Sequence, residues 1–162
     1  MIGSDARRRV LAAVLGAMLG LVAVPAGHAQ SEFANLPCVD IGATVTESRG
    51  GPGVSEEGLR DALYVGLRAK LPRLVVHQAC VDTLRLIVVL ISPSRDVFYG
   101  TADMALLRRA IVVDTGQFVR SEVWRMAYVL HGSPGGAKGQ LLELVDEMLT
   151  RFAADYQRSG NS

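Results

Sequence analysis

The stretch from Thr83 to Ile91 is apolar at nearly every position and ends at the turn-forming sequence Ser92-Pro93-Ser94. A short apolar run bounded by turn residues predicts a strand that is buried on both faces, because a strand with one wet face would alternate. Such a strand belongs at the centre of a sheet. The rest of the chain must therefore supply neighbouring strands and the elements that cover them.

Two other regions predict those neighbouring strands. Apolar and polar residues alternate along residues 38–47, which is typical of a half-buried strand. Residues 97–113 and 118–131 flank the sequence Asp114-Thr115-Gly116-Gln117, in which the glycine can adopt the positive φ of a tight turn. These last two regions predict a long antiparallel hairpin.

The hairpin register can be counted outward from its turn. Pairing Val113 with Phe118 leads to two further cross-strand pairs, Arg109 with Glu122 and Leu107 with Trp124.

The first strand of this hairpin could also be interrupted. Residues 102–110 include several good helix formers, which leaves open a helical or bulged interruption there.

Two amphipathic helices are also predicted. Ser55 is a good N-cap, and the two glutamates after it suit the first turn of a helix that Pro72 limits. Leucines from 59 to 71 recur every four residues along this helix, and a second stripe with helical spacing runs from Leu141 to Tyr156. The element order is then strand, helix, three strands, helix. It predicts a two-layer α+β fold with a four-stranded, mostly antiparallel sheet and both helices on one face.

The first 29 residues predict a cleavable signal peptide. Three arginines, Arg7 to Arg9, precede an apolar run that ends at Val24, and small residues follow up to Ala29. The run is shorter than the ~20 residues of a membrane-spanning helix. We therefore expect export to the periplasm or beyond after cleavage near Ala29, without a transmembrane anchor in the mature protein. An extended segment (30–37), a single domain (38–157) and a frayed tail (158–162) would follow.

Both cysteines, Cys38 and Cys80, lie beyond the expected cleavage point. An even pair in an oxidising compartment predicts a disulfide. A metal site formed by the two cysteines and His77 is the weaker alternative, because no fourth ligand is evident. No lipid anchor is expected at Cys38, which lies well past the cleavage point.

Charge and motifs exclude several classes of function. Loss of the leader, with three arginines and one aspartate, changes the net charge of +1 to about −1, which does not favour nucleic-acid binding. Neither the GxSxG motif of serine hydrolases nor the HExxH motif of zinc proteases occurs. Cleavage of the leader would remove one of the three histidines and leave His77 and His131. We expect no cofactor and no metal. A small hydrolase that uses one of these histidines remains the second alternative.

A stripe on the second hairpin strand is the candidate partner surface. Trp124, Met126 and Tyr128 recur with period two, and Leu107 lies on the neighbouring strand. Arg109 and Arg125 could form a polar rim around such a patch. A place in the core explains the same stripe, so both interpretations stay open.

Over residues 38–157 the predicted element order resembles that of small bacterial envelope accessory lipoproteins, including lipopolysaccharide-assembly and ABC-transporter auxiliary components. The resemblance is one of architecture and carries over no site residue. It favours a non-enzymatic accessory or assembly protein that binds another protein, or itself, through a sheet face or the hairpin. A carrier of an apolar ligand such as a lipid, or a transport auxiliary, is the first alternative.

Overall fold

The computed structural model describes residue 33, residues 35–48 and residues 51–160. The expected signal peptide and its cleavage near Ala29 lie outside the described residues. Seven elements follow one another along the described chain: β1 (Cys38–Glu47), α3 (Glu56–Lys70), β2 (Val75–Val76), β3 (Thr83–Ile91), β4 (Phe98–Ile111), β5 (Phe118–Gly132) and α4 (Pro134–Arg158).

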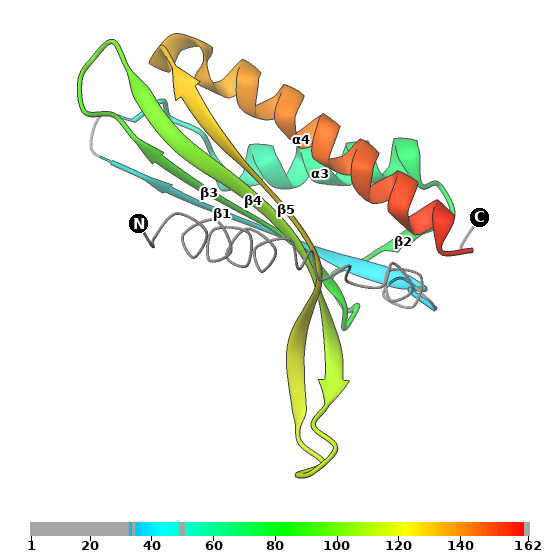
Figure 1. The fold of residues 1–162 in the computed structure, drawn as a ribbon. Helices are drawn as coiled ribbons and strands as arrows, with labels where there is room; N and C mark the ends of the chain where they lie inside the picture. The colour runs from blue at the N-terminus through cyan, green and yellow to red at the C-terminus, as the bar shows by residue number, and fades with distance from the viewer. Residues whose placement is uncertain (1–32, 34, 49–50, 161–162) are drawn as a thin grey trace, which may run out of the picture.

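The strands form one mixed sheet in the order β2-β1-β3-β4-β5 (Figure 1). β1 runs parallel to both β2 and β3, whereas β3, β4 and β5 are antiparallel to their neighbours along the chain. The fold is α+β with both helices on one side of the sheet, as expected, but the sheet has five strands and is mixed. Two residues of β2 are too few to leave a periodic pattern, and alternation does not reveal the direction of pairing.

Local signals explain the first helix. The Ser55 side chain accepts a hydrogen bond from the Gly58 amide at 3.1 Å, and two glutamates occupy the first turn, where the helix dipole favours negative charge. The helix ends at Lys70, two residues before Pro72. Its apolar stripe is fully buried: Leu59, Leu63 and Leu67.

One face of the sheet forms the core with the helices. The even-numbered side chains of β3 are buried there: Leu84, Leu86, Val88 and Leu90. On the other face Ile87 and Val89 are only half-buried, and Ile91 is 55% exposed. The prediction that β3 is buried on both faces is therefore wrong, because both helices cover the same side. We call this second side the open face; it carries the odd-numbered residues of β3, of β4 up to Ala105 and of β5 from Arg125.

The hairpin differs from its predicted register. Its turn takes up Val112 to Gln117, closed by a 2.9 Å bond from the Val112 amide to the Gln117 carbonyl, so Ile111 faces Phe118. A bulge then shifts the pairing between Leu106 and Leu107. As a result Arg109 faces Arg120 and Leu107 faces Glu122, while Trp124 faces Leu106. The region 102–110 is strand, interrupted by this bulge and not by a helix.

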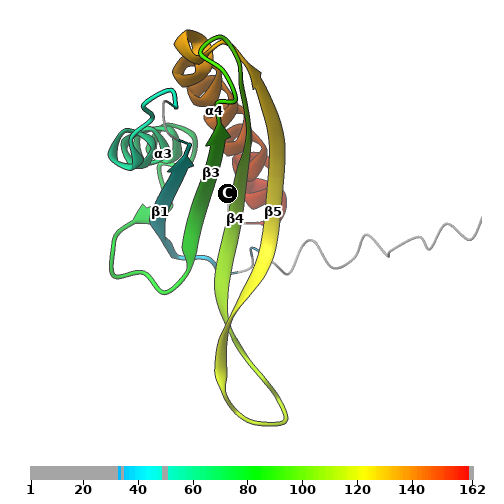
Figure 2. The ribbon, with the colours of Figure 1, turned by 90° about the vertical axis from the view of Figure 1, so that its left-hand side faces the viewer.

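Beyond the bulge, the hairpin projects away from the two layers of the fold (Figures 1 and 2). We call this part, residues 107–122, the arm. Its root is tied to the body by Arg108, whose Nε donates to Asp82 Oδ2 at 3.2 Å with both side chains largely buried. Asp82 Oδ1 also accepts a hydrogen bond from the Arg109 amide at 3.4 Å. These bonds orient the arm relative to the sheet.

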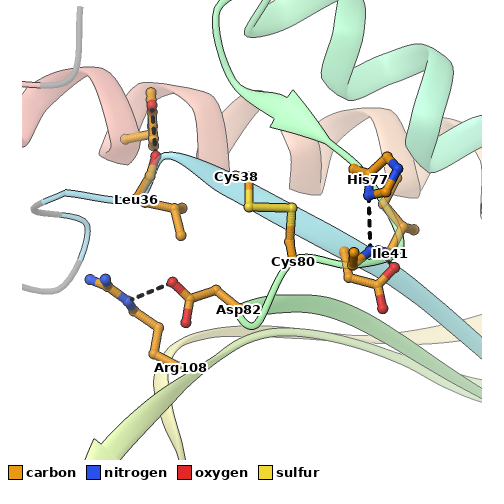
Figure 3. Close-up of a disulfide and its surroundings, with 10 residues drawn as sticks. Leu36, Cys38, Ile41, His77, Cys80, Asp82 and Arg108 are labelled. Carbon is orange, nitrogen blue, oxygen red and sulfur yellow. Dashed lines mark hydrogen bonds and ion pairs between the residues drawn. A yellow bond between two sulfur atoms is a disulfide. The ribbon is translucent and has the colours of Figure 1, made fainter.

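The predicted disulfide is present between Cys38 and Cys80 (Figure 3). It joins the first residue of β1 to the loop before β3, two elements that pair with each other. Asp82, which holds the arm through Arg108, lies two residues after Cys80. The crosslink therefore fastens the segment from which the arm is anchored.

Removing this disulfide should lower the free energy of unfolding by about 4 kcal/mol, since it closes a loop of 42 residues and restricts the unfolded chain. The measurement is chemical denaturation of the protein and of the double variant Cys38→Ser/Cys80→Ser. The reductant-treated wild type serves as the matched control and should coincide with the variant. Equal stability of oxidised and reduced wild type would contradict the expectation.

Candidate interaction site

The predicted stripe Trp124, Met126 and Tyr128 lies on the helix side of β5 and packs against the core. Trp124 Nε1 donates to Asp155 Oδ2 at 2.8 Å, and the indole ring meets Phe152 edge-on with centroids 5.2 Å apart. These side chains therefore hold α4 on the sheet. Whether they also contact a partner stays a prediction.

Tyr128 makes a second tie between β5 and α4. Its hydroxyl donates to Glu147 Oε1 at 2.8 Å. This hydrogen bond to the carboxylate, with smaller contributions from desolvation and charge, raises the pKa of Tyr128 above its ordinary value. The neutral, hydrogen-bonded phenol is therefore the form that ties the helix to the strand at neutral pH.

The other three residues of the predicted surface lie elsewhere. Leu107 and Arg109 belong to the arm, whereas Arg125 lies on the open face, paired with Asp103 at 2.9 Å from its Nε. The hydrogen bond to Asp103 raises the pKa of Arg125, with weaker help from Glu122. The six residues thus do not form one patch. The bulge separates the arm residues from the rest of β5, and the observed register of the arm differs from the predicted one by two residues.

The end of the arm gathers several exposed apolar side chains. Val113 is 93% exposed, Phe118 64% and Ile111 59%, and Val112 and Val119 are also exposed. Arg109 stacks over the Phe118 ring, with its Cζ 5.1 Å from the ring centroid. Arg109 and Arg120 face each other across the two strands, and neither forms an ion pair within the described residues.

The sequence contains one signal for this site, at the turn of the hairpin. Val112, Val113 and Phe118 flank the polar residues Asp114 to Gln117 there. Apolar residues beside the turn of a long hairpin lie beyond the reach of helices that cover only the body of the sheet. Without the register and the direction of the arm, however, they look like ordinary strand residues.

The cysteines and histidines that the sequence offers for a metal or catalytic site lie apart or are already bonded. Cys38 and Cys80 are joined to each other, so they offer no thiolate to a metal and the alternative site with His77 is overturned. His77 Nδ1 accepts a hydrogen bond from the Ala79 amide, and His131 lies opposite Tyr99 on the open face. In the described part of the chain, no group of three or more histidine, cysteine and acidic residues could hold a metal.

Surface hollows lie along both helices. One, of about 300 Å³, lies between α3 and β1, and acidic and basic side chains border it together with Tyr64 and His77. Another, of about 450 Å³, lies where Lys70 to Leu74 meet the end of α4. A third, of about 340 Å³, lies between the two helices, with Leu59 and Leu142 among its lining residues. The lipid alternative stays an untested prediction.

Residues before the expected domain boundary also contribute to the core. Phe33 and Leu36 are fully buried, and the Phe33 ring lies 5.4 Å from that of Phe152. Tyr156 donates a hydrogen bond to the Leu36 carbonyl at 3.3 Å, and burial raises the pKa of its hydroxyl. Within the residues that the structure covers, no helix is long and apolar enough to span a membrane.

Comparisons with known proteins give distant structural likenesses only. No family model and no curated protein matches the chain. A solved PelC dodecamer from Paraburkholderia phytofirmans, carrying one substitution, is 15% identical, with 70% of this chain and 84% of that one covered and a TM-score of 0.43. A minor lipoprotein from Acinetobacter baumannii is 11% identical over 78% of this chain and 94% of that one (TM-score 0.37). A putative neuraminyllactose-binding hemagglutinin homolog from Helicobacter pylori is 7% identical over 72% and 78% (TM-score 0.33).

Truncating Trp124 to alanine should lower the free energy of unfolding by about 3 kcal/mol, since it removes a packed ring and leaves Asp155 without this donor. Val129→Ala, on the open side of the same strand, is the control and should change it by less than about 0.5 kcal/mol. Chemical denaturation measures both. Equal effects would mean that the contact between Trp124 and α4 contributes little to stability.

Proposed function

We propose that this chain is an exported, non-enzymatic accessory or assembly protein that works by binding another protein through its arm. The observation that carries the proposal is the exposed apolar end of the arm, above all Val113 and Phe118. Apolar side chains gathered on a projecting element are unfavourable in water and become favourable when a partner covers them. Aromatic residues and arginines are also the types that protein interfaces favour.

The arm is suited to reach a partner without disturbing the fold. It extends beyond both helices (Figures 1 and 2), and its apolar end takes no part in the core. The bonds between Arg108 and Asp82 hold its root against the crosslinked loop. A partner would therefore meet a pre-oriented element, which lowers the entropy cost of binding.

Two arginines specify the chemistry of that partner. Arg109 and Arg120 lie directly opposite each other, and like charges in such a cross-strand pair repel. A carboxylate of the partner placed between them would remove this repulsion and accept hydrogen bonds from both guanidinium groups. We therefore expect the partner to present an acidic side chain beside an apolar patch.

Export is supported by two features. Residues 1–29 have the pattern of a signal peptide, and the disulfide between Cys38 and Cys80 suits an oxidising compartment. N-terminal sequencing of the exported protein from the native host should therefore give a mature N-terminus near residue 30.

A photo-crosslinking residue at position 118 should give a discrete adduct with one partner protein in the native cell envelope. The same residue in place of Val65, which is 65% exposed on α3, is the matched control and should give none. Arg109→Glu/Arg120→Glu should weaken the adduct at least about tenfold by repelling an acidic partner.

The fold of these variants should be unchanged, because the substituted side chains are exposed. Circular dichroism and the midpoint of denaturation check this. Equal adducts from positions 118 and 65, or an adduct that the two glutamates leave unchanged, would contradict binding through the arm.

A further inference from the structure

The two edges of the sheet differ in how well their backbone groups are protected from the addition of another strand. Along the β1 edge, β2 covers the first residues, and the His77 amide donates to the Val39 carbonyl at 3.1 Å. Farther along, two backbone amides that point away from β3 are hydrogen-bonded to carboxylates. Asp40 Oδ1 accepts a hydrogen bond from the Ile41 amide at 2.7 Å, and Glu56 Oε1 accepts one from the Val45 amide at 3.0 Å. Another strand cannot add here without displacing these groups.

The opposite edge has no such protection within the described chain. β5 is the last strand of the sheet and pairs only with β4 there. From Met126 to Gly132 the strand contains no Asp, Glu, Lys, Arg or proline, and its bulge lies outside this stretch. Arg125, the nearest charge, is already paired with Asp103. Charge, proline and a bulge are the devices that usually prevent strand addition, and this stretch has none of them.

We propose that this edge is a docking site for a second copy of the chain, joined through antiparallel pairing of β5 with the partner's β5. A two-fold axis at Tyr128 would pair Met126 with the partner's Leu130 and Ala127 with the partner's Val129. Tyr128 would face the partner's Tyr128. The pairs from Met126 to Leu130 are uncharged, and the next pair would join Arg125 to the partner's His131, so no acidic pair and no pair of arginines or lysines meets across the two-fold axis.

The side chains also match by face. Even-numbered residues of this part of β5 point toward the helices and odd-numbered ones toward the open face, and the proposed pairing joins even to even and odd to odd. Both helical layers would then lie on the same side of one continuous sheet. On that side, the edge is bordered by Glu147 and Arg151, which form an ion pair with 3.8 Å between charged atoms, so each copy contributes no net charge from this pair.

This inference is independent of binding through the arm. The arm begins on the far side of the bulge and projects away from the fold (Figure 2), so the paired copies would each keep a free arm. The failure of either proposal leaves the other standing.

The test uses two double variants of the mature, disulfide-bonded protein. Val129 is 78% exposed and Ala127 is also exposed, so charges at both positions are compatible with the fold. In Ala127→Lys/Val129→Lys, each lysine would face a lysine of the partner. In Ala127→Lys/Val129→Glu, each lysine would face a glutamate of the partner, at the same two positions.

Sedimentation equilibrium over a wide concentration range should show a reversible dimer for the wild type. The lysine pair should weaken dimerisation at least about tenfold, and the lysine–glutamate variant should recover it, because repulsion becomes attraction across the dyad. Val113→Ser/Phe118→Ser should dimerise like the wild type. A wild-type monomer at all concentrations, assemblies larger than two, or equal dimerisation of the two charge variants would overturn the proposal.

Discussion

Burial of one face of β3 under both helices is the constraint on which the remaining structure depends. The side chains from Leu84 to Leu90 that point to this face are buried completely, whereas those of the opposite face are left half-covered. Because α3 must return over the same face, β1 and β3 are parallel neighbours, and the disulfide at Cys80 can close that unit. Two helices cannot also cover the far end of a hairpin as long as β4 and β5. The arm is thus a direct result of how little of the sheet the helices cover.

Much of this fold was predictable because its signals are local. The alternation in residues 38–47, the cap at Ser55 and the apolar run in β3 each identify an element without reference to its neighbours. Pairing is not local. The two-residue β2 has no period, and parallel contact between β1 and β3 depends on the path of α3. The bulge beside Leu107 moves one residue between faces, and no composition rule for the surrounding strands predicts its place.

The candidate site was predicted less well, for a related physical reason. A period of two shows that Trp124, Met126 and Tyr128 share a face, but it does not say what covers that face. The carboxylates of Asp155 and Glu147 come from the next helix, 31 and 19 positions after Trp124 and Tyr128 respectively, and only the packed structure shows that they accept hydrogen bonds from the indole and the phenol. The sequence predicts Arg109 only as a strand residue opposite Glu122 and as part of a polar rim. Its place beside exposed Phe118, opposite Arg120, became clear only with the register.

The carboxylates of Asp40 and Glu56 have a consequence for the solubility of the chain at high concentration. Sheets with two reactive edges can recruit molecules without limit and grow into fibrils. On the β1 edge, the amides of Ile41 and Val45 are already hydrogen-bonded to acidic side chains. If a second copy pairs at β5 as proposed, both outer edges of the combined sheet are β1 edges of this kind, and further strand addition would have to displace these carboxylates. The proposed pairing would then stop at two copies instead of continuing into an amyloid-like polymer.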